Sequence, residues 1–126
     1  MRNDEAGHPI TELIARLDEP ARSVLEALRV RSLELVPDAV EGISYGIPTL
    51  LYRGSALVAV AVTKSGYSAY PFSGRVITAL ADALTGIAHT KGAVQFTDAR
   101  PLPPAAFDAL VLARRAEIDA TLDRAE

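Results

Sequence analysis

The side chains best suited to chemistry in this sequence are its tyrosines and two of its cations. All four tyrosines lie in the stretch 43–72, which alternates short apolar runs with turn residues: Tyr45, Tyr52, Tyr67 and Tyr70. Lys91 lies at the start of a later apolar run, and Arg114 lies on the apolar stripe of a C-terminal helix. Tyrosine hydroxyls and cationic side chains both donate hydrogen bonds to anionic oxygens. We therefore expect Tyr45 and Tyr70 to line, with these two cations, a cleft for a small anionic or carboxylate-bearing molecule.

Of the two interpretations of these cations, we favour the simpler one. An arginine on an apolar stripe can be satisfied by a carboxylate of its own chain, and Glu117 and Glu41 are both candidates. Its long stem can also lie on the apolar surface while the guanidinium reaches water. In this interpretation Lys91 is solvated and the tyrosines belong to an ordinary sheet.

Enzymatic signatures are absent from the sequence. It contains no Gly-x-Gly-x-x-Gly loop, no Walker loop, no Gly-x-Ser-x-Gly elbow and no His-Glu-x-x-His motif. Of the two histidines, His8 lies near the N-terminus and His89 has no carboxylate close to it in sequence. A serine hydrolase would need His89 to activate a serine, and no motif supports such a pair. We therefore favour a binding domain over an enzyme.

Acidic residues in the N-terminal half raise the question of a metal site. Glu19 and Glu26 lie seven positions apart, so they share a face of a predicted helix. Arg22 and Arg29, however, are spaced to form ion pairs with Glu26. A solvated, ion-paired face accounts for this pattern better than an iron site does. We assign no metal ligand and no cofactor, and iron binding stays open.

Length and composition limit the class of protein. A chain of 126 residues that is 49% hydrophobic and 23% charged is typical of one globular domain. We place this domain at 9–126, after a flexible tail at 1–8. The absence of cysteine suits the reducing cytoplasm, and no apolar run reaches the roughly 20 residues that span a bilayer. The net charge of −3 argues against a nucleic-acid partner, which needs a positive surface.

Apolar spacing and turn residues predict the elements that must position these side chains. Helices are expected at 9–17, 19–37, 74–85 and 104–123, with Asp18 and Ser73 as N-caps of the second and third. Strands are expected at 40–45, 49–52, 56–63, 67–72 and 93–97. The order α-α-β-β-β-β-α-β-α predicts an α+β domain, an antiparallel sheet of about five strands with helices packed on one face.

The strand 56–63 is expected in the middle of the sheet, because it is apolar on both faces. Its valines should meet the helices, so the predicted core is Val58, Val60, Leu25, Leu28, Phe107 and Leu110. Its small side chains Ala59 and Ala61 should leave the opposite face open. An open apolar face usually marks a partner or ligand surface, so we predict a symmetric homodimer or a covered groove there. Helices folded over this face are the alternative.

Four short motifs occur in an order that is similar to that of a known family. They are Ser44-Tyr45-Gly46 with Pro48, Tyr70-Pro71, Lys91-Gly92, and Pro101-Leu102-Pro103 followed by a helix with Arg114. In this combination the chain resembles the YdhG-like family of small domains of unknown function, from about residue 9 onward. The resemblance implies a helix-flanked antiparallel sheet, and it adds Ser44 to the expected ligand-binding residues.

The resemblance also implies a function. Some members of the family are described as frataxin-like iron chaperones, which deliver iron to iron–sulfur or haem assembly. This sequence departs from the family pattern at Gly66, where members often carry a histidine, and at Gln95, where a basic residue is common. Two hypotheses follow, an iron chaperone and a module that binds a small anionic or carboxylate ligand.

Overall fold

The computed structural model describes residues 7–124. Within them, helices and strands follow the predicted order: α2 (Pro9–Ala15), α3 (Ala21–Leu35), β1 (Val40–Ser44), β2 (Ile47–Tyr52), β3 (Ser55–Thr63), β4 (Gly66–Tyr70), α4 (Gly74–Ala79), β5 (Val94–Phe96) and α5 (Pro104–Arg124). The strands form one antiparallel sheet in the order β1-β2-β3-β4-β5. The predicted α+β class is therefore confirmed. The expected tail at 1–8 lies largely outside the described residues.

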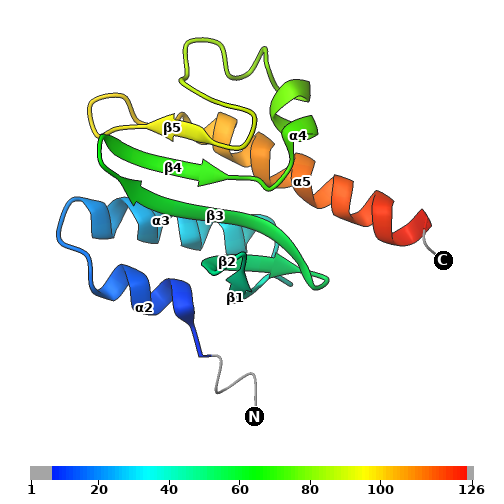
Figure 1. The fold of residues 1–126 in the computed structure, drawn as a ribbon, viewed down its shortest axis with the longest axis horizontal. Coiled ribbons are helices and arrows are strands. Elements are labelled where there is room, and N and C mark those ends of the chain that lie inside the picture. Colours follow the sequence, from blue (N-terminus) through cyan, green and yellow to red (C-terminus); the bar gives the residue numbers. More distant parts are fainter. Residues whose placement is uncertain (1–6, 125–126) are drawn as a thin grey trace.

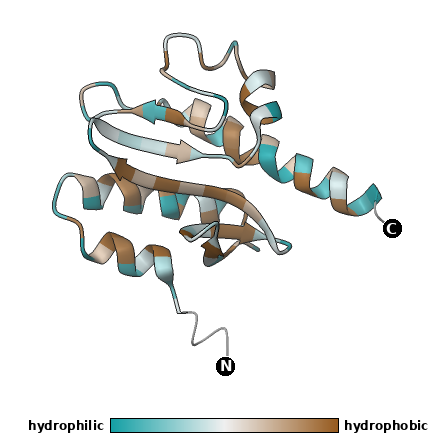
Figure 2. Ribbon diagram, viewed as in Figure 1, coloured by the Kyte–Doolittle hydropathy of each residue, from teal (hydrophilic) through white to brown (hydrophobic). Residues whose placement is uncertain are grey.

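The helices cover one face of the sheet (Figure 1). Helices α3 and α5 pack against β3 and against each other, while α2 packs against α3 and beneath β1 and β2. The short α4 lies against α5 at one end of the sheet. Figure 2 shows that β3 is hydrophobic along most of its length, as suits the middle strand of the sheet. Among the described helices, none is long and apolar enough to cross a membrane.

A β-bulge changes which residues of β3 are buried. Leu50 of β2 pairs with Val58, whereas the next residue, Leu51, pairs with Ala56, so Leu57 is the extra residue. A bulge breaks the strict alternation of a strand. Three consecutive residues, 57–59, are accordingly buried. The predicted valine face is correct at Val58, but Val60 is half-buried and Val62 is 46% exposed.

The face of β3 opposite the helices is less open than expected. Ala59 is only 2% exposed within the single chain, and Ala61 is half-buried. The homodimer inferred from an open alanine face therefore loses the observation on which it was based. The other predicted core residues are buried, Leu25, Phe107 and Leu110 completely and Leu28 in part.

Two helix ends differ from the prediction. Helix α3 begins at Ala21, so the side chain of Asp18 is not its cap, and the Glu19 carboxylate instead accepts the backbone N–H of Ser23 at 3.0 Å. Hydrogen bonds from the Ser23 side chain and backbone lower the pKa of Glu19. Helix α4 ends at Ala79 rather than at residue 85, and turns continue the chain to Gly86 at φ +81°. The predicted cap Ser73 is confirmed, because its hydroxyl accepts the Val76 N–H at 3.3 Å.

Glu41 joins the edge of the sheet to the first two helices. Its Oε1 accepts the backbone N–H groups of Ile10 at 2.8 Å and Thr11 at 2.9 Å, and its Oε2 accepts the Thr11 hydroxyl at 2.6 Å. Nη1 of Arg29 in α3 lies 3.7 Å from Oε2. The carboxylate therefore satisfies the first N–H groups of α2, which the helix itself cannot pair.

Candidate functional site

Two of the predicted site residues lie at the turn between β1 and β2. Ser44 is half-buried at the end of β1, and Tyr45 follows it with 88% of its surface exposed. The Tyr45 ring stacks on Phe72, with ring centroids 6.2 Å apart and planes 15° apart. Both residues have positive φ, +54° and +57°, which bulky side chains rarely adopt. The surrounding turns must therefore hold this aromatic pair in place.

Arg114 is paired within its own chain. Its Nε donates to the carbonyl oxygen of Ala56 at 2.9 Å, and its Nη1 donates to Glu117 Oε1 at 2.7 Å. Glu117 also accepts the hydroxyl of Ser73 at 3.0 Å. Burial raises the pKa of Glu117, but the hydrogen bonds from Ser73 and Arg114 outweigh it and hold that pKa below its usual value. Glu117 is thus the partner that the simpler interpretation of Arg114 anticipated.

Lys91 and Tyr70 lie apart from this pair. Lys91 is exposed beside α4, at a hollow of about 470 Å³ that it lines with Gly74, Arg75, Thr78 and Ala79. Tyr70 is half-buried on β4, opposite Ala59. Tyr45 is connected to Arg114 through Phe72, Ser73 and Glu117, but among residues 7–124 no hydrogen bond or ion pair joins Lys91 or Tyr70 to that group.

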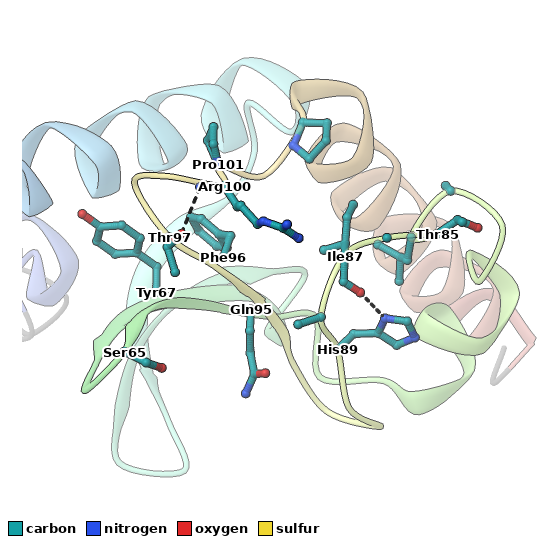
Figure 3. Close-up of a pocket in the computed structure, with 15 residues that line it drawn as sticks. Ser65, Tyr67, Thr85, Ile87, His89, Gln95, Phe96, Thr97, Arg100 and Pro101 are labelled. Atoms are coloured by element: carbon teal, nitrogen blue, oxygen red, sulfur yellow. Dashed lines mark hydrogen bonds between the residues drawn. The ribbon is translucent and has the colours of Figure 1, made fainter.

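A larger cavity, of about 920 Å³, lies elsewhere in the molecule (Figure 3). Its volume is within the range of about 300–1,000 Å³ typical of small-molecule sites. The side chains of Tyr67 and Phe96 line it and pack together, with ring centroids 5.4 Å apart. One wall is the segment 83–89, and the other is the segment 97–103, which carries Pro101 and Pro103. The lining is mostly apolar.

Hydrogen bonds join one wall to the sheet and brace the other wall internally. On one side, the Gln95 N–H of β5 donates to the Ala88 carbonyl at 2.8 Å, and Leu84 is fully buried. On the other side, the Thr97 N–H donates to the Arg100 carbonyl at 3.1 Å and the Arg100 N–H returns to the Thr97 hydroxyl at 2.9 Å.

Arg100 supplies the charge of this cavity. Its side chain extends from the proline-containing wall towards Ile87 on the opposite wall (Figure 3). Arg100 is exposed, and within residues 7–124 no carboxylate lies within 4.0 Å of its guanidinium. Arg16, Arg22 and Arg75 also lack an ion pair among these residues, but they do not line the cavity. The arrangement leaves a cation directed over apolar walls and free to meet an anion.

Nearby polar groups are already engaged. Asp98 accepts the hydroxyl of Tyr67 at 2.8 Å, and this hydrogen bond, with burial and the charge of Asp98, raises the pKa of Tyr67. His89 Nδ1 lies 2.8 Å from the Ile87 carbonyl. Because a carbonyl oxygen only accepts, this contact is a hydrogen bond in the tautomer that carries the proton on Nδ1.

Little in the sequence indicates this site. Arg100 directly precedes the Pro101-Leu102-Pro103 motif, and His89 has no carboxylate close to it in sequence. The one available signal is a cation directly before a stiff segment, since proline restricts its own backbone and that of the residue before it. This signal does not indicate that residues 83–89 form the opposite wall.

Comparisons with known proteins bear on the fold alone. No protein-family model matches the chain, and no curated protein matches it. Among solved structures, the chain is similar to YdhG of Bacillus subtilis, a protein from the DUF1801 family. The TM-score is 0.74 at 16% sequence identity, over 94% of this chain and 92% of that one. The resemblance predicted from four short motifs is thereby confirmed for the fold, and the match says nothing about a ligand.

Proposed function

We propose that the protein is a binding domain for a small organic anion, which it holds in the cavity between residues 83–89 and 97–103. The observation that carries this proposal is the position of Arg100. Its guanidinium extends across an apolar cavity and, among the described residues, meets no carboxylate. An anionic ligand would supply the missing partner.

Both parts of the cavity favour such a ligand. A guanidinium presents paired N–H donors that match the two oxygens of a carboxylate or sulfonate. The apolar walls would remove the body of the ligand from water, which contributes about 25 cal/mol for each Å² buried. The hydrogen bonds between Thr97 and Arg100 hold the backbone in place beforehand, so binding would order little of the chain.

A small organic anion is also the ligand class of the second sequence hypothesis. That hypothesis places the anion at Tyr45, Tyr70, Lys91 and Arg114, whereas this proposal places it at Arg100. The iron-chaperone hypothesis finds no support in the part of the chain that the structure describes, where no group of three or more histidine and carboxylate side chains could hold a metal ion. Glu26 instead pairs with Arg29 at 2.7 Å. The cysteine-free composition fits a cytoplasmic setting for the proposed binding domain.

Substitution of Arg100 tests the proposal. The probe is anilinonaphthalene sulfonate, an apolar anion whose fluorescence rises in apolar surroundings. We expect the wild-type protein to bind it saturably at one site, and Arg100→Gln to weaken binding by about tenfold or more, because a hydrogen bond to a charged group is worth about 1.5–3 kcal/mol. Arg100→Lys should restore part of the affinity.

The matched control is Arg16→Gln, which removes an exposed arginine at the C-cap of α2. It changes the net charge equally and should leave the dissociation constant unchanged. Circular dichroism melting curves would show that all three variants stay folded. Equal affinity of Arg100→Gln and wild type for the probe would contradict the proposal.

A further inference from the structure

We infer that the cavity selects a monocarboxylate with an apolar body over a phosphorylated or a neutral molecule of the same size. This inference rests on the proposed function and specifies its ligand. Three features of the cavity carry it: the number of its charges, the state of its backbone N–H groups and the polarity of its walls.

The first feature is a single cation. Among the described residues that line the cavity, Arg100 is the one arginine, lysine or carboxylate. It can neutralise the one charge of a carboxylate. A phosphate monoester carries about −1.5 to −2 at neutral pH, so part of its charge would remain unpaired beside apolar walls, which is unfavourable.

The second feature is that the backbone donors closest in sequence to Arg100, together with two on the opposite side of the cavity, are already used. Phosphate sites commonly rely on free backbone N–H groups at a helix N-terminus or in a glycine-rich loop. In this cavity the N–H groups of Ile87, Gln95, Thr97 and Arg100 donate to acceptors of the chain itself. The three or more donors that a phosphate group needs are therefore not provided by these residues.

The third feature separates a carboxylate from a neutral ligand. A neutral molecule of the same shape would cover the guanidinium of Arg100 without pairing it, and a buried unpaired charge is unfavourable. The accessible apolar surfaces of Ile87, Pro101 and Pro103 in turn favour a hydrocarbon body over a polar one. A short fatty acid has both properties.

Competition of three eight-carbon molecules with the fluorescent probe tests the inference. Octanoate, octyl phosphate and octanol would each be titrated into the wild-type protein with bound anilinonaphthalene sulfonate. The titrations are made at about pH 8, where the phosphate carries nearly two charges. We expect octanoate to displace the probe at a concentration about tenfold lower than octyl phosphate or octanol does. Calorimetry should give the same order of affinities. In Arg100→Gln the advantage of octanoate over octanol should disappear.

The outcomes separate the two proposals. Displacement by octyl phosphate as readily as by octanoate would overturn the selectivity, and so would equal displacement by octanol. If none of the three displaces the probe or gives heat, while probe binding still depends on Arg100, the ligand class is wrong and the anion-binding function stands. If the probe itself does not bind saturably, both fail.

Discussion

Replacing Phe107 with alanine is expected to lower the free energy of unfolding by about 3–5 kcal/mol, because the change removes a whole buried ring and leaves a void. Phe107 lies in the second turn of α5, is 1% exposed, and belongs to the core between this helix and the sheet. A domain of this kind has a total stability of about 5–15 kcal/mol. Urea denaturation followed by circular dichroism would measure the loss.

Leu112→Ala is the matched control on the same helix, since Leu112 is 44% exposed. Its truncation should change the free energy of unfolding by less than about 1 kcal/mol. Losses of equal size in the two variants would show that α5 does not turn the face of Phe107 towards the sheet. The comparison therefore tests the orientation of α5 as well as the burial of one ring.

Glu41→Ala is expected to lower the free energy of unfolding by about 2–4 kcal/mol, because hydrogen bonds to a charged group are worth about 1.5–3 kcal/mol and their loss leaves donors unpaired. The carboxylate is only 7% exposed and accepts three hydrogen bonds from Ile10 and Thr11. Arg29 would keep its pair with Glu26 at 2.7 Å, which limits the damage.

Chemical denaturation of Glu41→Ala beside Glu34→Ala would measure this effect. Glu34 has a side chain that is 59% exposed and pairs only with Arg31 at 3.2 Å, so its loss should change stability by less than about 1 kcal/mol. Glu41→Gln should lie between the two, because an amide oxygen still accepts but carries no charge. Equal stability of the two alanine variants would mean that Glu41 does not hold α2 against β1.

Local sequence signals predicted most of the fold. The strands β1 to β4 follow from short apolar runs separated by turn residues, and the cap Ser73 was identified from its position before α4. Two predicted helix ends are wrong, because neighbouring residues compete to provide the cap or the end of a helix. Helix α3 uses the side chain of Glu19 rather than that of Asp18 near its start, and α4 ends after Ala79. The bulge at Leu57 was not predicted because it depends on register with β2.

The functional residues were harder to predict, for a reason of chain topology. The walls of the Arg100 cavity come from segments on either side of β5, and their approach depends on the bond from Gln95 to Ala88. Arg114 likewise meets Ser73 only through Glu117. Ser73 and Glu117 are 44 positions apart in sequence. Spacing along the chain identifies side chains that could bind an anion, but pairing within the fold decides which of them stays free.

The most direct measurement of the central claim is a heteronuclear NMR titration of the isotope-labelled protein with octanoate. If an organic anion binds beside Arg100, backbone amide signals of residues 83–89 and 95–100 should shift in a saturable way, and those of Arg100→Gln should shift far less. Shifts centred on Tyr45, Phe72 and Arg114, or no saturable shift in either region, would contradict the assignment of the binding site to this cavity.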